Sequence, residues 1–441
     1  MNILLLSPYP PYPPHGGGTM RIYQIARGLA ERHRVTCLSF AADQAAERAL
    51  APLQRVCRVV TVRGPAARGL PRRTWTTVSS PLPDMALRNQ APAYADSLRA
   101  LLATERFDVV QAESIEMAAY LTNDERRTAN DGRRATDDRR PLRVLDQFNA
   151  EYLLQKRAAL TSLRAAVAAP LKDPKSRAQS LAGGVYSLAQ WRKLARYEAR
   201  VMRACDLVLA VAEEDRATLR GLAPEARVGV VPNGVDTEHF SRAALARDRA
   251  GPLALAQPTL VFSGTLDFRP NVDAVVWFAS EVLPRVRARC PAARLLVVGR
   301  RPAPALLQLA AAGAIVLTGE VPDARPFIAG ASVYVVPMRI GGGVRLKLLE
   351  ALSLEVPVAS TAMGAEGVAG LRGGEHCLLA DDPAGLADAV LRLLGDATLA
   401  RGLGQAGRAL VRERYDWRSI VPRLEALYAT ALAGRRVSAP M

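Results

Sequence analysis

The sequence is poor in the residues that build metal sites and disulfide frameworks. Its 441 residues include only five cysteines and four histidines, and these are scattered along the chain without a C-x-x-C pair. Zinc sites and disulfide frameworks both need such residues at short, regular spacings, so we expect neither. The scattered cysteines are typical of a protein in a reducing cytoplasm.

Long apolar runs are also missing. None reaches the ~18 residues that a membrane-spanning helix needs. The N-terminal run, MNILLLSPYPPYPP, has no basic segment ahead of its apolar residues and breaks off at prolines. It therefore predicts a first strand rather than a signal peptide.

Aromatic residues make up only 5% of the chain, whereas the formal net charge is +17. A basic balance can indicate nucleic-acid binding, but base-stacking platforms need aromatics and no recognition module is present. We therefore expect no nucleic-acid partner. The positive charge then reflects either an arginine-rich composition on solvated faces or an attraction to anionic membranes or phosphorylated substrates.

Short apolar runs that alternate with amphipathic stretches dominate the sequence. NILLLS, VTCLSF, RVVTV, FDVVQAES and LRVLDQF belong to the first half, and TLVFS, ARLLVVG, SVYVVPM and VPVAST to the second. This alternation predicts an α/β protein whose parallel sheets are covered by helices on both faces. We place two domains over residues 1–245 and 246–415, followed by a terminal helix over residues 416–436.

Two segments of the first half depart from this alternation. Residues 122–143 are polar and charged without periodicity, which predicts a mobile surface insertion. Residues 153–203 are helical and strongly basic, with interleaved apolar positions. Such a segment is either a pair of helices packed on the sheet with solvated outer faces, or a surface that rests on anionic lipid headgroups.

The loops after the strands are where ligands bind in doubly wound sheets. The first of them, SPYPPYPPHGGGTMR, contains three glycines, which let the backbone come close to a ligand. Its pattern is not G-x-G-x-x-G, so the fingerprint of a dinucleotide site is absent here.

The stretch GGGVRLKLLEALSLEVPVAST, residues 341–361, carries the clearest chemistry. We predict a helix that begins near Gly343, where free N–H groups favour phosphate. Arg345 and Lys347 oppose the helix dipole there unless an anion is bound. Glu350 would lie about 10 Å along the axis at ~1.5 Å per residue, which suits ribose hydroxyls beyond a diphosphate. The alternative, a surface ion pair between Lys347 and Glu350, leaves the glycines unexplained.

This stretch resembles the nucleotide-sugar signature of glycosyltransferase family 4, retaining enzymes of the GT-B fold, and in particular the subgroup written G-G-G-x-R-L-K-x-L-E-A. Further matches are PYPPHGGGTMRIYQIARGL, FDVVQAES, NAEYL, VPNGVD and SGTLDFRPNVDAVVWF. The resemblance implies two Rossmann-like domains with parallel sheets facing a central cleft. The C-terminal domain would bind the nucleotide and the N-terminal domain the acceptor, with the last helix crossing back to the first domain.

Carried over residue by residue, the resemblance implies that Glu350 binds the ribose hydroxyls. It makes Arg345 and Lys347 catalytic residues at the diphosphate or donor sugar. Glu113 would orient the donor sugar or assist deprotonation of the acceptor. The alternative is a structural role, in which its carboxylate accepts hydrogen bonds from loop N–H groups. The other substrate-binding residues that the resemblance implies are Gly17, Gly18, Asn233, Gly234, Gly264, Gly341, Gly342, Gly343, Gly364, Ala365 and Glu366.

The sequence departs from the family pattern at several of these positions. Gly342 stands where most members carry the first glutamate of a Glu-x7-Glu pair. Glu113 and Phe148 stand where many relatives have histidine, and an Arg/Lys pair after the first strand of the nucleotide domain is reduced to Thr265 and Arg269. The phosphates therefore depend on the two cations of the 341–361 stretch.

We expect a retaining glycosyltransferase that moves a sugar from a UDP- or GDP-sugar to a glycan or a lipid-diphosphate-linked acceptor, in cell-surface polysaccharide or glycoconjugate biosynthesis. No strand-end Asp-x-Asp motif argues for a metal, and no cofactor is expected. Two alternatives are a nucleotide-sugar 2-epimerase and a non-catalytic partner in a polysaccharide-assembly complex. We expect a cytoplasmic location, peripheral on the inner membrane face if the basic segment binds lipid.

Overall fold

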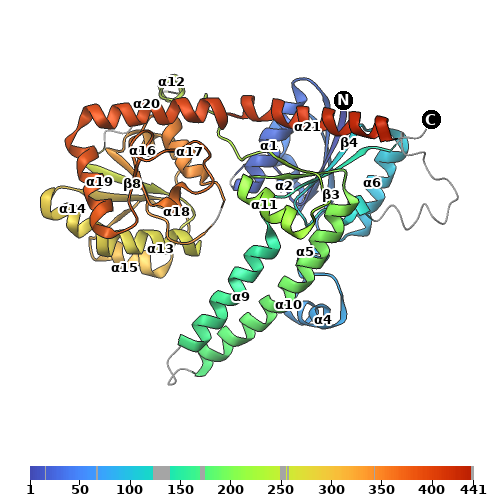
Figure 1. Cartoon of the computed structure of the whole chain (residues 1–441), viewed down its shortest axis with the longest axis horizontal. Helices are drawn as coiled ribbons and strands as arrows, with labels where there is room; N and C mark the ends of the chain where they lie inside the picture. The colour runs from blue at the N-terminus through green and yellow to red at the C-terminus, as the bar shows by residue number, and fades with distance from the viewer. Residues whose placement is uncertain are drawn as a thin grey trace. The chain divides into compact units, whose positions relative to one another are not determined.

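The chain folds into two α/β units, each built on its own parallel sheet (Figure 1). The computed structural model describes residues 1–14, 16–65, 68–122, 140–168, 174–248, 255, 258–341 and 343–438. The first unit comprises Met1–Val231 and Val421–Met441, and the second comprises Pro232–Ile420.

The sheet of the first unit has seven strands in the order β3-β2-β1-β4-β5-β6-β7, all parallel. Its strands are apolar on both faces because helices cover both sides. They are β1 (Asn2–Ser7), β2 (Arg34–Ala41), β3 (Arg58–Arg63), β4 (Val109–Glu113), β5 (Leu142–Asp146), β6 (Leu207–Ala210) and β7 (Val228–Val230).

The helices of the first unit connect these strands, and the last helix of the chain begins in the second unit. They are α1 (Gly17–Ala30), α2 (Gln44–Ala49), α3 (Ala51–Gln54), α4 (Leu70–Ser79), α5 (Asp84–Arg88), α6 (Pro92–Thr104), α7 (Ala119–Thr122), α9 (Glu151–Ala168), α10 (Pro174–Ala204), α11 (Glu213–Leu222) and α21 (Trp417–Ser438).

The sheet of the second unit has six parallel strands in the order β10-β9-β8-β11-β12-β13. Figure 1 shows α13 and α15 on one face of this sheet and α17 and α20 on the other. The strands are β8 (Thr259–Ser263), β9 (Arg294–Val298), β10 (Val316–Leu317), β11 (Val333–Val336), β12 (Val358–Ser360) and β13 (Leu378–Leu379). The helices are α12 (Arg242–Arg247), α13 (Arg269–Trp277), the π-helix η2 (Phe278–Val282), α14 (Leu283–Arg289), α15 (Pro304–Ala311), α16 (Arg325–Ala329), α17 (Leu346–Ser353), α18 (Ala362–Ala365), α19 (Pro383–Gly395) and α20 (Ala397–Arg414).

Both sheets reverse their strand order once, and these reversals locate the places where ligands bind. In the first unit the order reverses between β1 and β4, and in the second between β8 and β11. Ligands of doubly wound sheets bind beyond the carboxyl ends of the strands at such a reversal. The predicted α/β architecture with two parallel sheets is therefore confirmed, and it directs attention to the loops after these four strands.

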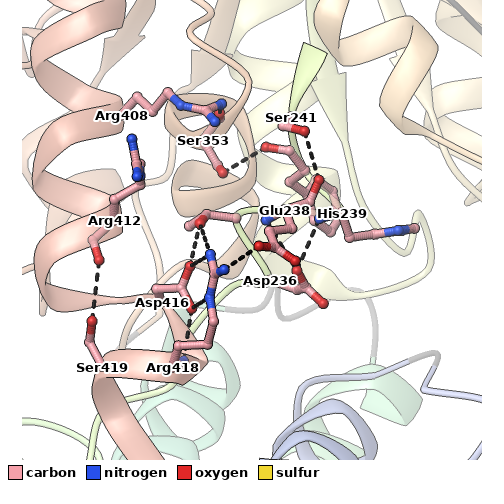
Figure 2. A network of polar contacts seen from close by, with 12 residues as sticks. Asp236, Glu238, His239, Ser241, Ser353, Arg408, Arg412, Asp416, Arg418 and Ser419 are labelled. Carbon is pink, nitrogen blue, oxygen red and sulfur yellow. Dashed lines mark hydrogen bonds and ion pairs between the residues drawn. The ribbon is translucent and has the colours of Figure 1, made fainter. Parts of the chain in front are cut away.

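The two units divide between Val231 and Pro232, whereas the sequence suggested a division after residue 245. Residues 232–245 belong to the second unit because they are bonded to the start of α21 (Figure 2). The Val235 N–H donates to the Tyr415 carbonyl at 2.8 Å. The Thr237 hydroxyl donates to the Asp416 carboxylate, and Arg418 donates to the Glu238 carboxylate. No change of composition marks this division in the sequence.

The basic segment predicted over residues 153–203 forms α9 and α10, which lie side by side as a long hairpin (Figure 1). Most of the insertion predicted over residues 122–143 lies outside the described residues, because residues 123–139 are not among them. Leu142 and Arg143 already belong to β5. Among the described helices, none is both long and apolar enough to cross a membrane.

Candidate donor site

The reversal point of the second sheet brings Gly264 against two polar side chains. Gly264 follows β8 and has φ of +154°. A Cβ atom at this position would lie 2.8 Å from both Lys347 Nζ and Asn271 Nδ2. Glycine is therefore required here, because any other residue would displace the lysine or the asparagine.

Lys347 is held at this point by a hydrogen bond and by an aromatic ring. Its Nζ donates to Asn271 Oδ1 at 2.9 Å and lies 3.9 Å from the centroid of the Phe262 ring. The Asn271 amide in turn donates to the Thr265 carbonyl at 2.8 Å. Burial lowers the pKa of Lys347 to about 7, although the neighbouring Glu350 carboxylate raises it. The lysine can therefore exchange a proton near neutral pH.

The glycine loop before α17 ends later than the sequence suggested. Gly343 has φ of +73°, a left-handed conformation that cannot continue into a helix. The helix therefore begins at Leu346 rather than near Gly343, with Arg345 as its N-cap. Glu350 lies four residues beyond Leu346, or about 6 Å along the axis at ~1.5 Å per residue. The distance of about 10 Å expected from the helix start to Glu350 is thus too long.

Arg345 folds back onto the glycine loop. A Cβ atom at Gly341 would lie 2.5 Å from Nη2 of Arg345, so glycine makes room for the guanidinium. Burial lowers the pKa of Arg345, and the charge of Glu366 raises it. A Cβ atom at Gly367, the residue after Glu366, would lie 3.2 Å from the Gly343 carbonyl carbon. The loops that follow β11 and β12 therefore meet around Arg345.

Glu350 lies in α17 one turn beyond Lys347 and is half-buried. Burial raises its pKa to about 7, and the Lys347 ammonium lowers it. Lys347 and Glu350 are not a simple solvent-exposed ion pair, because the Lys347 ammonium donates its hydrogen bond to Asn271 instead. The second unit thus collects two cations and one carboxylate around the ends of β8 and β11.

Two of the predicted glycines, Gly364 and Gly234, are closely packed against backbone. A Cβ atom at Gly364 would lie 2.3 Å from the Val336 carbonyl, and one at Gly234 would lie 2.6 Å from the Tyr415 carbonyl. Asn233 adjoins Gly234, and Ala365 is half-buried in α18. Gly342 lies outside the described residues.

The first unit holds the remaining predicted residues at its own reversal point, after β1 and β4. Gly17 is exposed in the first turn of α1. A Cβ atom at Gly18 would lie 2.1 Å from Tyr9 Oη, so Tyr9 covers this glycine. Glu113 has no exposed surface; one of its oxygens accepts from Gln111 at 2.8 Å, and Oε2 has no hydrogen-bond partner among the described residues. Burial raises the pKa of Glu113 well above its usual range, which favours a protonated carboxyl.

Sequence reasoning missed a buried ion pair beside Glu113. The Arg21 guanidinium donates two hydrogen bonds to the Asp146 carboxylate, at 2.7 and 2.8 Å, and one to the Val231 carbonyl at 2.9 Å. Both side chains are at most 1% exposed. An arginine on the apolar side of α1 and an aspartate at the end of a buried strand were signals in the sequence. Asn271 was missed as well, because its partner lies 76 residues away.

Two family models match parts of the chain. Residues 257–396 match the model described as glycosyl transferases group 1, and residues 180–239 match that of glycosyltransferase family 4. The first match contains the loop and helix that hold Lys347 and Glu350. Together with the fold, these matches support a group 1 glycosyltransferase.

Curated relatives match about half of the chain. A phosphatidyl-myo-inositol mannosyltransferase of Mycobacterium leprae is 33% identical over 216 residues, which are 47% of this chain and 55% of the relative. A GDP-mannose-dependent alpha-(1-6)-phosphatidylinositol monomannoside mannosyltransferase of Mycolicibacterium smegmatis is 29% identical over 256 residues, which are 54% and 64% of the two chains. The matched region thus spans less than two thirds of these relatives.

Solved structures share the fold over nearly the whole chain. A sucrose-phosphate synthase from Thermosynechococcus elongatus has a TM-score of 0.67 at 17% identity, covering 98% of this chain and all of that one. The HepE protein of Anabaena in complex with UDP has a TM-score of 0.61 at 14% identity, with the same coverage. An alpha,alpha-trehalose-phosphate synthase from Burkholderia xenovorans has a TM-score of 0.62 at 12% identity, covering 97% and 100% of the two chains. The chain therefore has the two-domain GT-B fold.

Proposed function

We propose that the chain is a retaining glycosyltransferase whose donor is a UDP- or GDP-sugar. The observation that carries the proposal is the placement of Arg345 and Lys347 at the start of α17, beside the ends of β8 and β11 where the strand order reverses. A diphosphate at this point would receive two cationic donors and the N–H groups of the helix start. Glu350, one turn along the helix, would accept hydrogen bonds from the ribose hydroxyls.

The half-buried Lys347 suits a leaving diphosphate. In transfer, the bond between the sugar C1 and the phosphate oxygen breaks, and a bond forms between C1 and the acceptor oxygen. Negative charge develops on the departing phosphate, and cations fixed in a water-poor site stabilise it most. The acceptor hydroxyl gives its proton to the leaving phosphate. Glu113 is buried, so we assign it a positioning role beside the Arg21–Asp146 ion pair.

The first unit offers a surface for an anionic membrane. Trp75 and Val78 of α4 are 70% and 83% exposed, and Leu181 and Val185 of α10 are 52% and 57% exposed. Figure 1 shows α4 beside α10, and Lys193 of α10 donates to the Ser80 carbonyl just after α4 at 2.6 Å. Apolar side chains among many basic residues are typical of interfacial helices. We propose that this surface docks on anionic phospholipid, where a lipid-linked or glycan acceptor would be reached.

The function is tested by incubating the purified protein with a panel of UDP- and GDP-sugars and membrane-lipid extract. Transfer is read by mass spectrometry, and the anomeric configuration of the product by NMR. We expect transfer with retention, a loss of at least tenfold in kcat/KM for Glu350→Ala and for Arg345→Ala, and little change for the exposed Glu320→Ala. Equal turnover by all three variants would contradict the site. Parallel reactions with EDTA or added Mn²⁺ test the expected metal independence.

The same assay separates the alternatives. A 2-epimerase would convert a nucleotide sugar to its C2 isomer without an acceptor, which NMR detects directly. A non-catalytic partner would bind nucleotide without releasing product from any donor. Either outcome would replace the transferase proposal.

A further inference from the structure

The first unit contains a cavity that the donor site does not use. Its volume is about 720 Å³, within the range of sites for small molecules. The cavity is lined by the residues that directly follow three strands: Pro8 after β1, Ala42 after β2 and Gly64 after β3. These are the carboxyl ends of a doubly wound sheet, so the position itself favours a ligand.

The charge of the cavity is strongly positive. Four arginines and one aspartate are among the lining residues: Arg63, Arg68, Arg73, Arg88 and Asp84. The Asp84 carboxylate forms ion pairs with three of these cations. The nitrogen–oxygen distances are 2.9 Å to Arg68, 3.4 Å to Arg73 and 4.0 Å to Arg88. One carboxylate cannot neutralise three guanidinium groups. Glu116, outside the lining, is the partner of only one of them, Arg88, at 3.0 Å.

Ion pairs within the wall of the cavity hold three of these cations, Arg68, Arg73 and Arg88, in place. The side chain of Arg68 is 12% exposed and that of Asp84 is 10% exposed, so this central pair is held inside the wall. Arg63 ends β3 and is exposed to solvent. A site with this surplus repels metal cations and attracts anions with several oxygens, which guanidinium groups bind in a bidentate manner. Tyr9 and Phe40 add aromatic wall beside them.

Two contacts connect the cavity with the rest of the proposed reaction. Tyr9 lines it and also covers Gly18 of the glycine loop, as a Cβ atom there would lie 2.1 Å from its hydroxyl. Arg73 lines it from α4, the helix whose Trp75 and Val78 are exposed. A headgroup entering from a lipid surface at α4 would meet the arginines first.

We propose that this cavity binds the phosphate or diphosphate ester of the acceptor substrate. The acceptor role rests on the proposed transferase function; the anion site itself does not. The ester could belong to a lipid headgroup or to a soluble sugar phosphate, and both offer the same oxygens to the arginines.

The site is tested by calorimetric titration of inorganic pyrophosphate into the full chain, with UDP and GDP present in excess to occupy the donor site. We expect Arg63→Gln and Arg88→Gln each to weaken binding by roughly tenfold, because a charge-assisted hydrogen bond contributes about that factor. Arg55→Gln, another exposed arginine of the first unit outside the cavity lining, should leave the affinity unchanged. Arg63 is exposed, so its variant should fold normally.

Two further arms separate the sources of the ester and the two proposals. Vesicles of phosphatidylinositol in phosphatidylcholine, compared with phosphatidylcholine alone, report a lipid ester, and glucose 6-phosphate reports a soluble one. Either should lose affinity with Arg63→Gln. Pyrophosphate binding, measured in a parallel titration without nucleotide, that is lost in Lys347→Met but kept in both arginine variants would overturn the cavity site and leave the donor site standing. If pyrophosphate binding is lost only in the arginine variants and the protein binds neither UDP nor GDP, the cavity site would stand and the transferase proposal would be contradicted.

Discussion

Proton exchange at Lys347 makes nucleotide binding depend on pH. With a pKa of about 7, the side-chain amino group of Lys347 is about one-tenth protonated in the free protein at pH 8. An adjacent diphosphate favours the charged form by roughly 1–3 pKa units. Binding at pH 8 should therefore take up roughly 0.4 to 0.9 proton at Lys347, depending on the size of this shift. Glu350 titrates near the same pH with the opposite sign, but it is already about nine-tenths ionised at pH 8 and releases only about 0.1 proton.

Calorimetry of UDP and GDP binding in two buffers of different ionisation enthalpy measures this uptake. The wild-type affinity should fall by roughly two- to eightfold from pH 8 to pH 9, because the proton must be supplied from an increasingly basic solution. Lys347→Met should bind more weakly, with no uptake and a flat profile over this range. Arg401→Met, an exposed cation of the second unit, should behave as the wild type. Equal proton uptake by wild type and Lys347→Met would refute the assignment of the lysine to the diphosphate.

The same substitution should stabilise the protein without nucleotide. The folded-state pKa of Lys347 lies below its usual value of 10.5, so its cost to stability is full below pH 7 and disappears as the pH rises through 10.5. Each pKa unit corresponds to about 1.4 kcal/mol, and the lost hydrogen bond to Asn271 offsets about 1 kcal/mol. Urea unfolding at pH 7 should show Lys347→Met more stable by up to roughly 4 kcal/mol; a less stable variant would contradict the burial argument.

Three further outcomes follow from particular contacts. Gly364→Ala should lower the free energy of unfolding by about 1–3 kcal/mol in urea titrations, because its Cβ would overlap a backbone carbonyl of β11. Asp416→Asn should lower the free energy of unfolding by a similar amount at pH 7. Burial raises the pKa of Asp416, but hydrogen bonds from its neighbours outweigh this and hold the pKa below its usual range. The stabilisation by the carboxylate is therefore present above about pH 4 and lost in acid, where the wild type and Asp416→Asn should be equally stable. Trp75→Ser with Val78→Ser should weaken co-sedimentation with anionic vesicles at least tenfold, whereas Val316→Ser, at an exposed position of the second unit, should not; equal loss in both would refute the docking surface.

The sheets were the most predictable part of the fold. Strands such as Asn2–Ser7 and Val333–Val336 are short apolar runs buried on both faces, and this pattern is local in the sequence. The start of α17 was less predictable, because the left-handed conformation of Gly343 ends the loop three residues later than its sequence suggests. The division at Val231 depends on hydrogen bonds to residues more than 170 positions away, such as Thr237 with Asp416, which no local pattern contains.

The candidate site was predictable in its residues but not in their environment. Lys347 and Glu350 are visible as a spaced pair, yet their pKa values near 7 result from burial, which spacing does not reveal. The contacts of Lys347 with Phe262 and Asn271 are likewise distant in sequence. The glycines divide in the same way: Gly264 and Gly341 make room for polar side chains of the site, whereas Gly364 packs against a strand. Sequence spacing cannot separate these roles, because they depend on what approaches the missing Cβ atom.

Crystals of the protein grown with UDP or GDP would test the proposed donor site most directly. We expect the diphosphate within hydrogen-bond distance of Lys347 Nζ and of the Arg345 guanidinium, and both ribose hydroxyls on the Glu350 carboxylate. A nucleotide whose diphosphate instead lies among the arginines of the first unit, with the Lys347–Asn271 bond undisturbed, would contradict this assignment.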